Sequence, residues 1–158
     1  MNIIDSTTNL IIFEEVIITE ELNSSELYSA LKEWFVTRFK NADAVLHMDD
    51  RESGKFIGKA YVDLEIGKFN TRRTDFTIKI LIKEGRFKYI LTDFVQNLPI
   101  QNATLIPLED FVVKKLYNKK GKLVKGNARY KEEVIKFSQL ISEDLKNAIK
   151  TISEQDDW

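Results

Sequence analysis

The one histidine of this chain is the first candidate for a catalytic residue. His47 stands in a short apolar segment directly before the acidic residues Asp49, Asp50 and Glu52. A general base needs an orienting acid and a pocket, and the sequence gives His47 no recognisable motif of that kind. The three acids offer oxygen ligands, but the spacing and the distal glutamate of a calcium loop are absent. We therefore expect a partly exposed strand residue followed by a polar turn, with no catalytic residue, metal or cofactor.

Two Gly-Lys pairs, Gly54-Lys55 and Gly58-Lys59, superficially resemble a phosphate-binding loop. That loop requires Ser or Thr after the lysine and a helix directly behind it, whereas Ala60 follows Lys59 in a strand-like context. Gly58 is instead expected to let a helix approach the sheet closely, or to mark a bulge. The sequence also lacks a Gly-x-Ser-x-Gly elbow and any cysteine, so it predicts a protein that is not an enzyme.

The most conspicuous feature outside the predicted core is a basic run. Residues 114–131 carry eight bases and no acid, while residues 1–35 carry seven acids and a single base. Such a run can bind a polyanion, for example nucleic acid or lipid headgroups, through counterion release. It can equally be a solvated loop, or pair with the acidic N-terminal third. The candidate polyanion patch comprises Lys114, Lys115, Lys119, Lys120, Lys122, Lys125 and Arg129.

The composition is that of one globular domain. The 158 residues are 43% hydrophobic, enough to bury about two thirds of the unfolded surface, and the net charge of -1 gives no general attraction to nucleic acid or membrane. We expect a single domain over 1–158, with a core at about 10–152 and a frayed tail at 153–158. No segment is long and apolar enough to span a membrane, and the start lacks a signal-peptide pattern. We therefore expect a soluble chain, and the sequence leaves its cellular compartment undetermined.

The elements that must position these residues centre on 55–94, where three segments alternate between apolar and polar residues. Alternation with period two predicts strands, and Glu84-Gly85 predicts a tight hairpin turn. If Lys83 faces Arg86, the register places Ile82 beside Phe87, Ile80 beside Tyr89 and Ile78 beside Leu91. A slip of one residue would destroy this match.

Helices are predicted on either side of these strands. Asn23 and Glu26 form a capping box for a helix from about Ser24 to Phe39, and apolar residues recur at steps of three and four from Tyr130 to Ile152. Further strands are expected at about 10–19, 44–48 and 100–106. Residues 108–124 fit either a short helix or a hairpin. The result is an α+β fold with a mainly antiparallel sheet of five to seven strands and both long helices on one face.

These elements carry residues that resemble the bacterial family called domain of unknown function 4468, which has a TBP-like fold. The similar blocks are Ser25-Glu26-Leu27-Tyr28 with Trp34, Gly54-Lys55-Phe56-Ile57-Gly58-Lys59, Phe76-Thr77-Ile78-Lys79-Ile80, and Lys83-Glu84-Gly85-Arg86-Phe87-Lys88-Tyr89. The resemblance covers about residues 10–95. It implies an antiparallel sheet with helices on one face and no established activity. It also implies frequent export, to the periplasm or cell surface, in the Bacteroidetes group.

The second face of the predicted sheet is left without a partner. Its residues form an apolar centre with a lysine fringe, as docking surfaces do. We therefore expect a non-enzymatic binding or interaction module that uses this face or its basic rim to bind an unknown protein or small ligand, with the oligomeric state open. The alternative is a carrier with an apolar cavity between sheet and C-terminal helix. The candidate partner surface comprises Lys59, Tyr61, Lys79, Leu81, Lys88, Ile90 and Phe94.

Overall fold

The structure is a computed structural model that describes residues 3–40, 44–98 and 104–155. Its sheet contains β1 (Phe13–Ile18), β2 (Val45–Asp50), β3 (Lys55–Gly67), β4 (Asn70–Lys83), β5 (Arg86–Leu98) and β6 (Thr104–Pro107). The strand order is β1-β5-β4-β3-β2, with β6 paired to the far part of β5, and every pairing is antiparallel. The prediction of a mainly antiparallel sheet with five to seven strands is confirmed.

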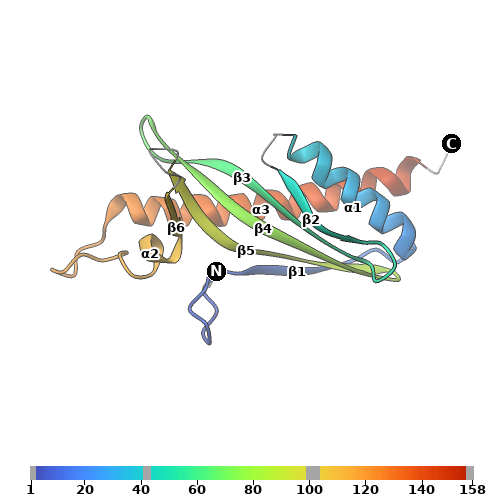
Figure 1. The fold of residues 1–158 in the computed structure, drawn as a ribbon, viewed down its shortest axis with the longest axis horizontal. Coiled ribbons are helices and arrows are strands. Elements are labelled where there is room, and N and C mark those ends of the chain that lie inside the picture. Colours follow the sequence, from blue (N-terminus) through green and yellow to red (C-terminus); the bar gives the residue numbers. More distant parts are fainter. Residues whose placement is uncertain (1–2, 41–43, 99–103, 156–158) are drawn as a thin grey trace.

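Three helices complete the fold: α1 (Ser24–Arg38), the single turn α2 (Glu109–Val112) and α3 (Lys125–Gln155). Figure 1 shows α3 running along most of the molecule behind the strands, with α1 beside it. Both long helices contact the same face of the sheet and each other. Among the described residues, no helix combines the length and apolarity that a bilayer crossing requires.

The predicted register of the central hairpin is confirmed. Lys83 pairs with Arg86, and the pairs of Ile82 with Phe87, Ile80 with Tyr89 and Ile78 with Leu91 follow. Gly85 adopts a φ of 73°, the left-handed conformation that this two-residue turn requires. Because side chains alternate along a strand, this register turns one apolar row of each strand toward the helices.

The predicted start of the first helix is also confirmed. The Asn23 side chain accepts a hydrogen bond from the backbone N–H of Glu26 at 2.9 Å, and Glu26 accepts one from the backbone N–H of Asn23. Such a capping box satisfies two backbone donors that the first helical turn leaves free.

Two predicted ends require correction. α3 has 31 residues, so it is longer than the sequence periodicity indicated, and it continues to Gln155 through the first part of the predicted tail. The rest of that tail, 156–158, lies outside the described residues, as do residues 100–103 of the predicted edge strand. Segment 108–124 proves to be both alternatives in turn: α2 comes first, and a small hairpin bridged by Tyr117 and Leu123 follows.

The core between helices and sheet is aromatic. The ring of Phe76 packs against Phe39, Phe94 and Phe137 at centroid separations of 5.5, 6.0 and 5.1 Å. All four side chains are buried. Each large buried ring contributes area removed from water and favourable edge contacts.

The close approach of α1 to the sheet depends on Gly58. A Cβ atom built on this residue would overlap the ring of Phe35, which packs directly over the strand. β3 and β4 keep their register across Gly58, but the ladder between β2 and β3 shifts beside it, because Leu46 pairs with Gly58 and Met48 with Ile57. Gly58 therefore lies under the first helix and also opposite a bulge of β2, which agrees with both predicted roles.

Substitution of Gly58 by alanine should lower the free energy of unfolding by about 1–3 kcal/mol, because the extra methyl group forces α1 or Phe35 to move. Chemical denaturation measures this loss. Gly126→Ala is the matched control, since nothing lies within 4 Å of its Cβ position, and its stability should stay unchanged or rise. Adding Phe35→Leu to Gly58→Ala should recover part of the loss relative to Phe35→Leu alone; additive losses would contradict the proposed contact.

Candidate functional site

The face of the sheet turned away from the helices, here called the outer face, carries the predicted apolar centre and lysine fringe. At one level of the sheet Lys79 lies between Ile57 and Ile90, and at the next level Leu81 lies between Lys55 and Lys88. Lys59 and Tyr61 follow along β3 on the same face. Six of the seven residues predicted for the partner surface are therefore brought together.

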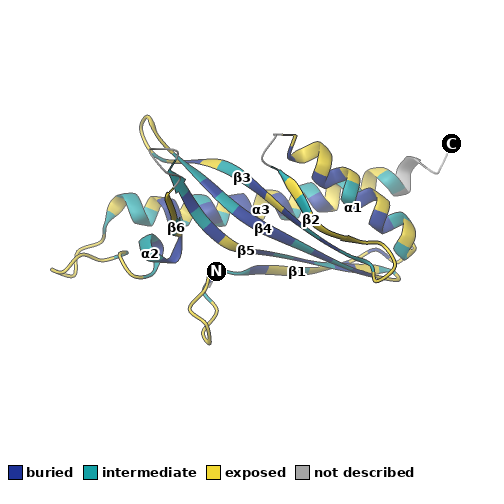
Figure 2. Cartoon of the chain, in the orientation of Figure 1, coloured by how far each residue is buried: buried dark blue, intermediate teal, exposed yellow. Residues whose placement is uncertain are grey.

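The outer face is open. Figure 2 shows exposed and half-buried residues alternating with buried ones along the long strands, as expected of a sheet covered on one side. Ile57, Tyr61, Leu81 and Ile90 are half-buried among their strand neighbours. Toward the sheet edges the apolar residues are more exposed, among them Val16, Ile18, Val45 and Met48.

Segment 108–124 does not cover this face. Leu108 and Val112 are buried on the helix side, where the ring of Phe111 lies 5.9 Å from that of Tyr130 on α3. The Asn127 side chain, at the start of α3, donates a hydrogen bond to the carbonyl of Lys115. Among the described residues, the apolar centre of the outer face therefore has no covering element.

The prediction that Phe94 belongs to the outer face is wrong. Its side chain is 1% exposed and packs between Phe13, at 5.8 Å, and Phe76, at 6.0 Å. The cause is a β-bulge: Thr77 pairs with Thr92 but Asp75 pairs with Val95, and the intervening Asp93 has a φ of 53°. An extra residue reverses the alternation of side chains beyond it, so Phe94 faces the helices and Val95 faces outward.

The charges of the outer face are divided between its two halves. The half nearest the β4–β5 turn carries mostly bases, and the only ion pair described there joins Lys88 to Glu14 at 3.3 Å. The other bases of this half make no ion pair with the described residues. They are Lys55, Lys59, Lys79, Lys83 and Arg86.

The half nearest the β3–β4 turn is acidic. Asp75 is held by Arg73 at 2.9 Å and by the Asn97 side chain at 3.0 Å, and the Arg73 guanidinium lies 4.0 Å from the centre of the Tyr61 ring. Asp63, Glu65 and Asp93 are exposed and have no ion-pair partner among the described residues.

A hollow of about 410 Å³ lies where these halves meet. Its lining includes Thr77, which belongs to the outer face. Thr77 is nevertheless only 3% exposed, because neighbouring side chains surround it. The lining combines apolar side chains with both signs of charge. Its residues include Val45, His47, Lys59, Arg73, Asp75, Asp93, Val95 and Leu105.

The acids that follow His47 are separated by the fold. His47 is exposed at a bulge of β2. Asp49 turns toward α1, where it accepts hydrogen bonds from the Tyr28 hydroxyl and the Lys32 ammonium. Asp50 instead accepts from the backbone of Ser53. Within the described ranges, no cluster of three or more His, Cys, Asp or Glu side chains could hold a metal ion.

The contact between Tyr28 and Asp49 perturbs both groups. Burial and the hydrogen bond to the Asp49 carboxylate raise the pKa of Tyr28 to about 12. The hydrogen bonds from Lys32 and Tyr28 hold the pKa of Asp49 below its usual value. A carboxylate held ionised in this way connects β2 to α1.

The basic run forms local contacts. Lys114 pairs with Asp110 at 3.1 Å and Arg129 with Glu133 at 3.1 Å, both one turn away in sequence. In the part of the chain that the structure describes, none of the run forms an ion pair with residues 1–35, so the alternative of pairing with the acidic N-terminal third gains no support there. Lys119, Lys120 and Lys122 lie at the exposed end of the 114–124 hairpin.

A larger hollow of about 870 Å³ lies between the N-terminal segment, β1 and α3. Its central group, Glu15, accepts hydrogen bonds from the hydroxyls of Tyr89 at 2.8 Å and Ser142 at 2.6 Å, and pairs with Lys146 at 2.7 Å. Partial burial alone would raise the pKa of Glu15, but the bonds from Lys146, Ser142 and Tyr89 outweigh it and hold the pKa below its usual value. These bonds connect the sheet to α3.

Strands β1 to β5 and the first helix carry the similarity to a known family. Residues 13–97 match the family described as a domain of unknown function (DUF4468) with TBP-like fold. The chain belongs to this family. No curated protein matches the chain.

Two solved structures confirm the TBP-like fold of this DUF4468 protein. A DUF4468 family protein from Bacteroides ovatus superimposes with a TM-score of 0.74 at 18% identity, over 92% of this chain and 90% of the other. A TBP-like protein from Parabacteroides distasonis gives a TM-score of 0.77 at 12% identity, over 94% and 98%. At such identities the likeness is one of fold.

One exposed residue was missed by the sequence reasoning. Phe69, at the β3–β4 turn, is 98% exposed and has a φ of 62°. The signal was the turn itself, because residues 67–70 read Gly-Lys-Phe-Asn and place an aromatic residue where a tight turn favours Gly or Asn.

The reversal of faces at Asp93 predicts opposite results for two aromatic residues. Phe94→Ala should lower the free energy of unfolding by about 3–5 kcal/mol, since it empties a packed site. Tyr61→Ala should cost less than about 1.5 kcal/mol, since its ring is half-exposed and stacks only with Arg73. Urea denaturation of both variants decides the point; equal losses would contradict this assignment of faces.

Glu15→Gln should lower the free energy of unfolding at neutral pH by about 1–2 kcal/mol, because a charge-assisted hydrogen-bond network is lost. The folded pKa of Glu15 lies below its unfolded value of about 4.3, so this contribution is complete above the unfolded pKa and disappears as pH falls through the folded pKa. Stability curves of wild type and variant should therefore converge in acid. A constant difference at all pH values would contradict the role of the ionised group.

Proposed function

We propose that this protein is a binding module rather than an enzyme, and that its outer face associates with the outer face of a second copy of the chain. The observation that carries the proposal is that the outer face, basic in one half and acidic in the other, is its own electrostatic complement. Complementary charge determines which surfaces associate and in which orientation.

The pattern is clearest along β3. Its outward side chains are, in order, Lys55, Ile57, Lys59, Tyr61 and Asp63. Consider two outer faces packed against each other with a two-fold axis between them. If this axis is perpendicular to the strands and passes over Lys59, Ile57 of one copy lies opposite Tyr61 of the other. The same axis places Lys55 opposite Asp63. An axis along the strands would instead oppose base to base, so the charge pattern favours the first arrangement.

The neighbouring strand repeats the pattern. Thr77 is the cross-strand partner of Lys59, and Lys79 and Asp75 stand one outward position to either side of it. The same axis therefore brings Lys79 near Asp75 of the second copy. The pairing of opposite charges across the axis is therefore found on two neighbouring strands, β3 and β4, and is not confined to one of them.

The size of the face is suitable. β3, β4 and β5 have 13, 14 and 13 residues, and β1 and β2 have six each. At a rise of about 3.3 Å per residue and about 4.8 Å between strands, the face covers roughly 800 Å². This area of about 800 Å² is what a standard interface takes from each partner.

Lys59 is the one residue that the arrangement disfavours, because it stands at the axis and meets Lys59 of the second copy. The hollow beside it contains Asp75 and Asp93, so each ammonium group has room and acidic neighbours on its own chain. This local repulsion should weaken the association without altering its geometry.

The alternative of an apolar carrier gains no comparable support. The space between the sheet and α3, where such a carrier would need its cavity, is occupied by the rings of Phe76, Phe94 and Phe137 in mutual contact. The hollows beside Glu15 and Thr77 are open to the surface and lined in part by polar side chains.

A charge swap tests the proposal. Lys55→Glu and Asp63→Lys should each weaken self-association roughly tenfold, because each turns two attractive contacts per dimer into repulsive ones and exposed pairs contribute about 0.2–1 kcal/mol each. An equimolar mixture of the two variants should recover the wild-type association, since every reversed charge then meets its opposite. Sedimentation velocity on the separate and mixed proteins measures this.

Lys59→Gln is the internal control and should strengthen the association, because it removes the repulsion at the axis. A wild-type chain that stays monomeric at its highest soluble concentration would contradict the proposal. So would self-association that neither reversal affects, because the interface would then lie elsewhere on the molecule.

A further inference from the structure

Two hairpins project from the same end of the molecule. The turn between β3 and β4 and the 114–124 hairpin both extend beyond the body at the end where α3 begins, as Figure 1 shows. Tyr130 of α3 connects them: its hydroxyl lies 2.6 Å from that of Thr74 on β4, and its ring packs on Phe111 ahead of the second hairpin. The two tips are therefore fixed to one support.

The tip of the first hairpin exposes an aromatic side chain on a residue with an unfavourable backbone conformation. Phe69 is 98% exposed and adopts a φ of 62°, a conformation that is unfavourable for an aromatic residue and natural for Gly. The Lys68 ammonium lies 5.7 Å from its ring centre. Neither the backbone nor the core gains from a phenylalanine here, so an external contact is the remaining physical reason for it.

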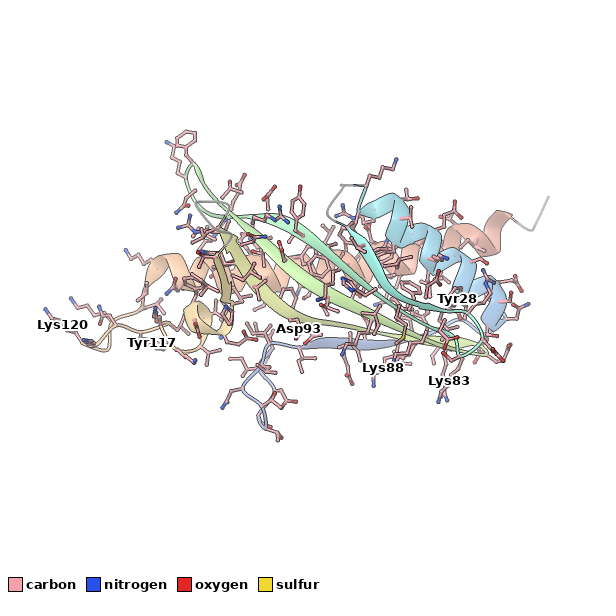
Figure 3. All side chains as sticks on the ribbon, in the orientation of Figure 1. Tyr28, Lys83, Lys88, Asp93, Tyr117 and Lys120 are labelled. Atoms are coloured by element: carbon pink, nitrogen blue, oxygen red, sulfur yellow. The ribbon has the colours of Figure 1, made fainter. Side chains whose placement is uncertain are left out.

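The tip of the second hairpin has the same composition in a preorganised loop. The Asn118 side chain accepts hydrogen bonds from the backbone N–H groups of Lys120 and Lys122 at 2.9 and 3.0 Å. Gly121 supplies the left-handed turn with a φ of 77°. Tyr117 and Leu123, on either side of the loop, are 60% and 50% exposed. Figure 3 shows Tyr117 and Lys120 at this end of the molecule and Lys83 at the opposite end.

The tips of both hairpins carry bases and no acids, although Asp63, Glu65 and Asp75 lie directly behind the first tip on β3 and β4. Residues 66–74 carry three bases and no acid, and residues 114–131 carry eight bases and no acid, in a chain whose net charge is -1. Among the described residues, Lys119, Lys120 and Lys122 form no ion pair. These three lysines are therefore available to an external anion, whereas Arg73, Lys114 and Arg129 are paired with Asp75, Asp110 and Glu133.

We propose that this end of the molecule binds the surface of an anionic phospholipid bilayer, with Phe69 and Tyr117 placed among the headgroups. Aromatic residues favour the membrane–water interface, and clustered lysines are attracted to anionic lipids. A flat surface can touch two separate tips at once. A single-stranded nucleic acid would instead require the aromatics to line a continuous basic groove. This surface lies beyond the outer face, so the inference does not depend on self-association.

Sedimentation with lipid vesicles tests the inference on the 158-residue chain. Binding is expected to vesicles of phosphatidylcholine with phosphatidylglycerol, to weaken as salt increases, and to be absent with phosphatidylcholine alone. Lys119→Glu with Lys120→Glu should reduce binding by at least about tenfold. The matched control, Lys40→Glu with Lys150→Glu, makes the same change of charge at exposed positions that belong neither to the two tips nor to the outer face, and should bind as wild type does.

Phe69→Gly separates a functional role from a structural one. It should weaken vesicle binding severalfold while leaving the denaturation midpoint unchanged or raised, because glycine relieves the strained φ. Loss of stability in Phe69→Gly, equal loss of binding in the control, or absence of binding to anionic vesicles would overturn the inference. Tight, salt-sensitive binding to a DNA oligonucleotide without vesicle binding would also overturn it, and would assign this end to nucleic acid.

Discussion

The structure depends on how closely α1 lies on the sheet, and Gly58 sets that distance. Because this residue has no side chain, the ring of Phe35 rests directly on β3. From there the aromatic contacts continue through Phe39 to Phe76, and from Phe76 to Phe137 on α3. Both helices are thereby held on one face. The rings fill the interior, so binding surfaces have to be sought on the outside of the molecule.

One-sided coverage has a direct consequence for function. A sheet that is buried on one face and polar on the other needs no explanation, but here the outer face retains an apolar centre around Leu81 and Ile90. Its charges are separated along the strands rather than interspersed. The second feature without a structural role is the strained, exposed Phe69. The two features lie on different surfaces, so the protein would have two independent means of association.

The β-bulge at Asp93 connects the fold to the outer face. It returns Phe94 to the core and turns Val95 outward, beside Asp75 at the edge of the hollow. A bulge bends its strand and increases the local twist of the sheet. A single extra residue thus changes both the content of the core and the shape of the candidate surface, without any change in the strand order.

The sequence by itself determined the central hairpin, its register, the capped first helix and the apolar stripe of α3, because each follows from local periodicity or turn chemistry. Of the seven residues that the sequence assigned to the outer face, six lie there. It could not determine the side of Phe94, since the bulge arises from a mismatch between two strands. Nor could it show that 114–124 projects away from the sheet, or that Phe69 and Tyr117 share one end. These depend on contacts between distant segments, such as Thr74 with Tyr130, which only the tertiary structure creates.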